Sequence, residues 1–158
     1  MAFRKKAEHI LRYSPDILIV PECEHFDKIK FPENFKQPTD KLWFGRNLNK
    51  GLAVFSFCNF RFKVLAIHNE DFKMIVPIAV TGGQFDFNLF AIWANNPADR
   101  DGHCVTQIWK AINHYDTLLT ERTTILMGDF NSNTIWDYKK HRQSDHWCCK
   151  FFKSQKYF

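Results

Sequence analysis

The middle of the chain constrains the fold most, because β-type segments follow one another there with only short connections. Four segments rich in aliphatic and aromatic residues span residues 52–57, 60–67, 72–80 and 86–93. Gly82-Gly83 lies between the last two and predicts a hairpin turn. A helix-then-strand pair is expected on either side of this block. That order predicts an α/β protein, of the α+β kind, with mixed sheets.

The two flanks show the same helix-then-strand pattern. Residues 3–13 have the apolar spacing of a helix, and residues 17–20 (ILIV) predict a strand buried on both faces. Residues 104–119 predict a second helix, and residues 123–127 predict a second buried strand. A short strand is expected around residues 42–44, within a stretch that otherwise reads as loop.

Composition limits the classes of protein to which this chain can belong. The 158 residues suit one domain, and 45% hydrophobic against 25% charged residues is globular rather than disordered. A formal net charge of +5 favours a phosphate-bearing partner, although a solvated basic surface explains it equally well.

Cysteines and apolar runs indicate the compartment. The five cysteines are odd in number and form no CxxC pair, so we expect no disulfide partner and a reducing compartment. No signal peptide is visible, and the apolar runs fall short of the roughly 20 residues of a spanning helix. We therefore expect a cytoplasmic protein that does not contact a membrane.

Acidic and amide residues follow the two predicted buried strands, where ligand sites of α/β sheets often lie. Glu22 follows the first strand, and Asp129 and Asn131 follow the second. Two such side chains, two positions apart in an extended loop, can face the same way and hold water or a phosphate oxygen. The alternative is a turn, because Asp and Asn side chains often bond nearby backbone.

Three segments carry a family resemblance, in the family's order along the chain. Residues 14–22 (SPDILIVPE), 51–56 (GLAVFS) and 125–131 (ILMGDFN) resemble motifs of the endonuclease/exonuclease/phosphatase superfamily. The resemblance implies a four-layered α/β sandwich, present here in part. It implies a metal-dependent phosphodiester hydrolase using Mg²⁺, or Mn²⁺, with nucleic acid as the expected partner. Other phosphodiesters, such as phospholipids or inositol phosphates, stay open as substrates.

The resemblance also implies roles for single residues. Glu22 matches the metal-binding glutamate, Asp129 the aspartate that aligns the water nucleophile, and Asn131 the asparagine that contacts the scissile phosphate. Trp93 and Asn96 lie where the family often places a His or Tyr near the phosphate, and are candidate substrate contacts. The alternative for Trp93 is a buried core aromatic.

Parts of the family pattern are absent. The family opens with a strand ending in Trp-Asn and closes with a second Asp and a Ser-Asp-His motif. We therefore expect residues 1–158 to form a single incomplete domain. Ser144-Asp145-His146 spells the closing motif, but it lies too close to Asn131, within a predicted last helix, and reads as a chance match. A zinc site formed by His141, His146 and Cys148-Cys149 fits no common spacing.

Two other functions stay open. One is an inactive, truncated fragment that at most binds metal or nucleic acid weakly, because loss of a general base removes much of the catalysis. The other is a binding module that uses aromatic and basic side chains to stack on single strands. The residues it would use are Trp43, Trp136, Lys139, Lys140 and Arg142.

Overall fold

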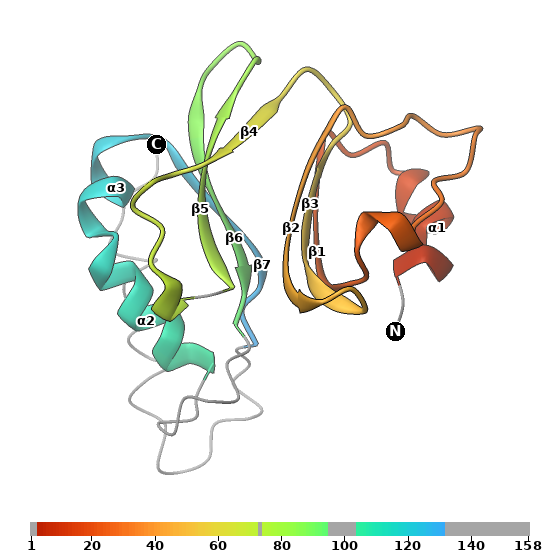
Figure 1. Ribbon diagram of the computed structural model, residues 1–158. Coiled ribbons are helices and arrows are strands. Elements are labelled where there is room, and N and C mark those ends of the chain that lie inside the picture. Colours follow the sequence, from red (N-terminus) through yellow and green to blue (C-terminus); the bar gives the residue numbers. More distant parts are fainter. Residues whose placement is uncertain (1–2, 73, 95–103, 132–158) are drawn as a thin grey trace.

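Two β-sheets pack face to face between helices, in the order helix, sheet, sheet, helix (Figure 1). This arrangement comes from a computed structural model that describes residues 3–72, 74–94 and 104–131. The strands are β1 (Ile17–Cys23), β2 (Asp40–Asn47), β3 (Lys50–Ser56), β4 (Arg61–Val64), β5 (Ile75–Thr81), β6 (Phe87–Trp93) and β7 (Thr124–Asp129). The helices are α1 (Ala7–Leu11), α2 (Cys104–His114) and α3 (Asp116–Glu121), with single 3-10 turns at Phe3–Lys5, Phe26–Lys28 and Glu70–Phe72.

The first sheet has the order β1-β3-β2 and is antiparallel throughout. Its central strand, β3, is buried from Gly51 to Ser56 because both of its faces are covered. The outer face carries Ala53 and Phe55, which pack against Phe3 and Leu11 of the N-terminal helical segment. The chain therefore uses its first helical segment to close one side of the sandwich.

The second sheet has the order β4-β5-β6-β7 and is the mixed one, since β6 and β7 run parallel. Its outer face carries Phe90 and Ile92, which pack against Ile108, Ile112 and Tyr115 of the C-terminal helical segment. A parallel pair needs a crossover connection, and α2 with α3 supplies it.

The inner faces of the two sheets form a third core cluster. Leu52 and Val54 of β3 meet Ile78, Leu89 and Trp93 of the facing sheet. Together with the two outer clusters, this gives the four layers of an α/β sandwich. The predicted fold class is thus confirmed, with one refinement: only the second sheet is mixed.

The predicted burial of two strands is wrong. Both β1 and β7 are edge strands within the described part of the chain, and neither is buried on both faces. Ile125 and Met127 of β7 are 39% and 40% exposed. Their apolar, β-branched sequences resemble those of central strands, and sequence does not reveal that each strand lies at the edge of its sheet.

Segment lengths also differ from the predictions. The short strand expected around residues 42–44 is the eight-residue β2, because it pairs with β3 from Asp40 to Asn47. The helix expected over residues 104–119 is broken at Tyr115, between α2 and α3. The one expected over residues 3–13 is a 3-10 turn followed by the short α1.

Candidate active site

Strand register brings the ends of β1, β6 and β7 and the start of β3 to one edge of the sandwich (lower edge in Figure 1). β1 and β3 are antiparallel and Cys23 pairs with Gly51, so the end of β1 lies beside the start of β3. β6 and β7 are parallel and Trp93 pairs with Asp129, so both strands end together. β1 also contacts β6 and β7 across the interface between the sheets.

Lys50 links the two sheets at this edge. Its Nζ lies 2.8 Å from Oε1 of Glu22 and 5.3 Å from the centroid of the Trp93 ring. Glu22 is on the first sheet, and Trp93 is the register partner of Asp129 on the second. One ammonium group therefore connects the end of β1 with the end of β6, the strand that pairs with β7.

Glu22 is held in a strained backbone conformation. The β1–β3 register shifts between Val20 and Cys23, and Glu22, in the bulge, has a φ of 59°. A non-glycine residue in this region is uncommon, and such strain is often found at functional positions. The side chain is 45% exposed. The hydrogen bond from Lys50 lowers the pKa of Glu22, so its carboxylate is ionised at neutral pH.

Glu24, two positions further on, has a different role. It is 2% exposed, and its carboxylate accepts hydrogen bonds from the backbone N–H groups of Phe3 (2.9 Å) and Arg4 (3.2 Å). The Arg4 side chain lies 3.3 Å away. Glu24 thus anchors the first helical turn, and the bulge at Glu22 sends the two carboxylates into different surroundings.

Asp129 and Asn131 form a tight turn. Oδ1 of Asp129 accepts from the backbone N–H of Asn131 (2.9 Å), and Nδ2 of Asn131 donates to the carbonyl oxygen of Ala94 (3.0 Å). Asn131 has a φ of 45°. The turn interpretation is therefore correct for the Asp129 side chain, whereas the Asn131 side chain bonds the distant Ala94. These two hydrogen bonds use only part of the hydrogen-bonding capacity of each side chain. Within the described ranges, no group donates to Oδ2 of Asp129.

Trp93 is a core residue, only 5% exposed, in the cluster between the sheets. The structure therefore supports the core interpretation that the sequence left open, and Lys50 covers the ring face. Asn96 and Ser144-Asp145-His146 lie outside the described residues, as do the predicted last helix and the basic and aromatic residues beyond Asn131.

Sequence reasoning missed Lys50. It stands in Asn49-Lys50-Gly51, which reads as an ordinary turn, and in the structure it begins β3 just after the β2–β3 connection. Nothing in the local pattern marks it as the partner of Glu22. Only the antiparallel pairing of β1 with β3 reveals the relationship.

Among the described residues, Glu22 and Asp129 both carry a carboxylate at this edge. No group of three or more His, Cys, Asp or Glu side chains suited to a metal occurs among the residues that the structure describes. Mg²⁺ needs fewer protein ligands, because it keeps several waters and takes one or two carboxylates plus substrate phosphates. An ionised, half-exposed Glu22 fits that requirement, provided that Lys50 moves aside.

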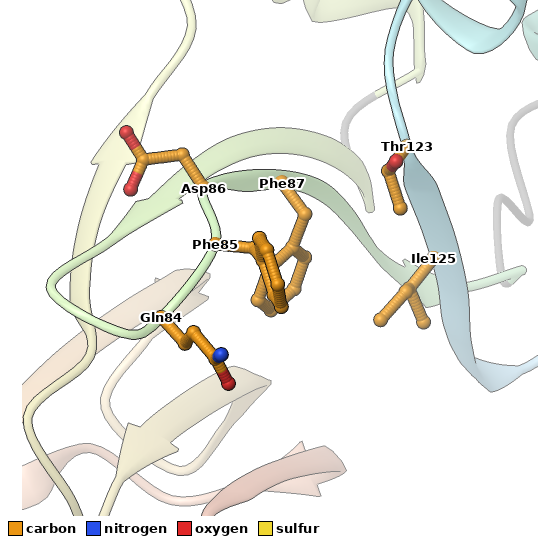
Figure 2. Close-up of a pocket in the computed structure, with 6 residues that line it drawn as sticks. All are labelled: Gln84, Phe85, Asp86, Phe87, Thr123 and Ile125. Atoms are coloured by element: carbon orange, nitrogen blue, oxygen red, sulfur yellow. The ribbon is translucent and has the colours of Figure 1, made fainter.

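A hollow lies at the opposite end of β6 and β7. It has a volume of about 700 Å³ and is lined by Gln84, Phe85, Asp86, Phe87, Thr123 and Ile125. Figure 2 shows the rings of Phe85 and Phe87 on one side, Ile125 on the other, and the Asp86 carboxylate turned away. Polar and apolar side chains line it in equal number, and it is separate from the edge where Glu22 and Asp129 lie.

Two further findings concern membrane-spanning helices and cysteine thiols. Within the described ranges, no helix is long and apolar enough to cross a membrane. Cys23 and Cys58 carry free thiols.

Comparisons with known proteins find a distant structural likeness. No family model matches the chain, and no curated protein matches it. A solved structure of an endonuclease/exonuclease/phosphatase family protein from Leptotrichia buccalis C-1013-b is similar, with 16% sequence identity and a TM-score of 0.47. The match covers 83% of this chain and 60% of that chain.

Proposed function

We propose that the chain is a metal-dependent phosphodiester hydrolase that acts on nucleic acid at the edge formed by β1, β3, β6 and β7. The observation that carries the proposal is the position of Lys50 between Glu22 and Trp93, the register partner of Asp129. Glu22 ends one motif segment, and Trp93 lies beside a second motif segment, far from the first in the sequence, that holds Asp129. Those segments are the ones that resemble the endonuclease/exonuclease/phosphatase superfamily.

Glu22 is the proposed ligand of Mg²⁺ or Mn²⁺. Its exposure and its lowered pKa support this role, because a metal ligand must be deprotonated and reachable. When bound there, the ion would polarise the phosphoryl group and neutralise part of its charge.

Asp129 and Asn131 are proposed to act on water and phosphate. The turn leaves Oδ2 of Asp129 as an acceptor that can orient a water molecule. The Asn131 amide has two N–H bonds and gives one to Ala94, which leaves the other for a phosphate oxygen. Because the turn fixes both side chains, they are held in place before substrate arrives, which lowers the cost of orienting them.

The net charge supports nucleic acid as the substrate. A chain with +5 attracts a polyanion, because neutralising phosphates releases counterions.

The test is cleavage of abasic, single-stranded and duplex DNA with magnesium, comparing the chain with Asp129→Asn. This variant keeps an oxygen for the Asn131 N–H and removes the charge that orients water, so we expect at least about a 100-fold loss. Asp86→Asn is the matched control, since Asp86 is exposed at the opposite end of β6. Equal rates for Asp129→Asn and the unaltered chain would refute the assignment.

The second candidate function is binding of a phosphodiester without hydrolysis. One observation favours it: no histidine in the described ranges hydrogen-bonds to or pairs with Glu22, Asp129 or Asn131. General acid–base catalysis most often uses His. Oligonucleotide binding that persists with no cleavage at any magnesium concentration would identify this function.

A further inference from the structure

The surroundings of Lys50 suit a cation at a binding site better than they suit a structural ion pair. Its side chain is 49% exposed, and that of Glu22 is 45% exposed. Exposed pairs of this kind contribute little to folding. The ammonium is nevertheless held from two directions, by the Glu22 carboxylate and by the face of the buried Trp93 ring.

The chemistry of the ammonium leaves it capacity for a further anion. It has three N–H bonds, of which the Glu22 oxygen accepts one. Lysine acts as a compact, mobile point charge and is a common ligand of phosphate. At this edge the anion expected under the proposed function is the phosphate of the nucleic-acid backbone.

Resting on the proposed function, we propose that Lys50 binds a backbone phosphate of nucleic acid. Until a metal ion binds Glu22, the Lys50 ammonium stays in its ion pair with the Glu22 carboxylate. A divalent cation at Glu22 and the Lys50 ammonium compete for the same carboxylate oxygen. A cation that binds Glu22 therefore releases Lys50 for phosphate, so metal and nucleic acid bind with positive coupling. Removing the charge of Glu22 releases Lys50 in the same way without any metal.

The test is the affinity of the full chain for a fluorescently labelled single-stranded oligonucleotide, measured by anisotropy over a range of salt, without magnesium and with it. With magnesium, Lys50→Met should bind about tenfold more weakly. The slope of its affinity against salt should fall by the equivalent of about one phosphate contact. Lys41→Met is the matched control, because Lys41 also lies over a ring, at 4.8 Å from the Phe26 centroid, but on the other side of the first sheet. Its affinity should not change.

The role of Glu22 is tested without magnesium. Glu22→Gln should bind the oligonucleotide several-fold more tightly than the unaltered chain, and Glu22→Gln with Lys50→Met should lose that gain. Thermal unfolding of each variant confirms that it is folded. The proposal is overturned if Lys50→Met and Lys41→Met bind alike, or if the gain from Glu22→Gln persists without Lys50.

These outcomes are separate from those for hydrolysis. Lys50-dependent binding with no cleavage supports the phosphate contact and refutes the hydrolase. Cleavage that depends on Asp129, together with binding that is unchanged in Lys50→Met, supports the hydrolase and refutes the phosphate contact.

Discussion

The backbone of Gly128 lies directly against the carbonyl group of Ile92. A Cβ atom added to Gly128 would be 1.9 Å from the Ile92 oxygen, and the φ of Gly128 is 140°. Glycine alone allows both the close approach and the backbone angle. β7 therefore reaches its parallel position beside β6, with Asp129 opposite Trp93, only because glycine precedes Asp129.

Gly128→Ala is expected to lower the free energy of unfolding by at least about 2 kcal/mol, from strain and from the clash with backbone. Urea denaturation measures it. Gly83→Ala is the control, because the three atoms nearest to an added Cβ there, the closest at 2.2 Å, belong to the Phe60 side chain and not to backbone, and the backbone has no positive φ. If both variants unfold at the same urea concentration, the close approach of β7 to β6 is not a constraint.

Glu24→Gln is expected to lower the free energy of unfolding by about 2 kcal/mol, because it removes a buried charge that accepts several hydrogen bonds. Burial alone would raise the pKa of Glu24, but hydrogen bonds from its own backbone N–H and from those of Arg4 and Phe3, with the charge of Arg4, lower it below the ordinary 4.5. Denaturation of both proteins at neutral pH measures the difference.

The same carboxylate gives a pH dependence. A folded-state pKa below the unfolded value contributes stability above the unfolded pKa, which is lost as the pH falls through the folded pKa. The unaltered chain should therefore lose stability below about pH 4.5 more steeply than Glu24→Gln. Parallel pH profiles for the two proteins would show that Glu24 is not the anchored group.

Cys58 should react with a thiol reagent in the folded protein, and Cys23 should not. Cys23 is fully buried, and burial raises its pKa to about 12, whereas Cys58 is partly exposed. Only the thiolate reacts readily. Peptide mapping by mass spectrometry reads each cysteine separately, and labelling of Cys23 before unfolding would contradict the described packing of β1.

Phe55→Ala should destabilise the chain by about 3–5 kcal/mol, as expected for a fully buried aromatic residue. Its ring contacts those of Phe3, Phe26, Phe31 and Phe57. Phe85→Ala is the matched control: Phe85 is 73% exposed, and its loss should change stability by less than about 0.5 kcal/mol. Equal losses would contradict the position of the core beneath β3.

Sequence patterns predicted the order of helices and strands well, because apolar periodicity is local, whereas the four layers were expected from the family resemblance. Gly82 with its positive φ falls in the predicted hairpin turn, and the central β segments occur where the apolar pattern places them. Burial was predicted less well. The apolar runs of β1 and β7 resemble central strands, yet exposure depends on the position of a strand within its sheet, which is not a local property.

The candidate site residues were chosen from local patterns as well. Glu22, Asp129 and Asn131 follow or end strands, and a local motif marks them. The separation of Glu22 from Glu24 depends on a bulge that sequence does not reveal. Lys50 is brought to Glu22 by strand pairing, so no spacing rule could identify it.

The proximity of Glu22, Trp93 and Asp129 is tested most directly by a nuclear magnetic resonance titration with Mn²⁺, whose unpaired electrons broaden the signals of nearby nuclei. If one cation site lies at this edge, low Mn²⁺ should broaden the backbone amide signals of Glu22, Asp129 and Asn131 and the indole signal of Trp93 together. Glu22→Gln should abolish the effect, while Asp86→Asn should leave it unchanged. Broadening that spares Asp129 and Asn131, or that survives in Glu22→Gln, would contradict a shared site.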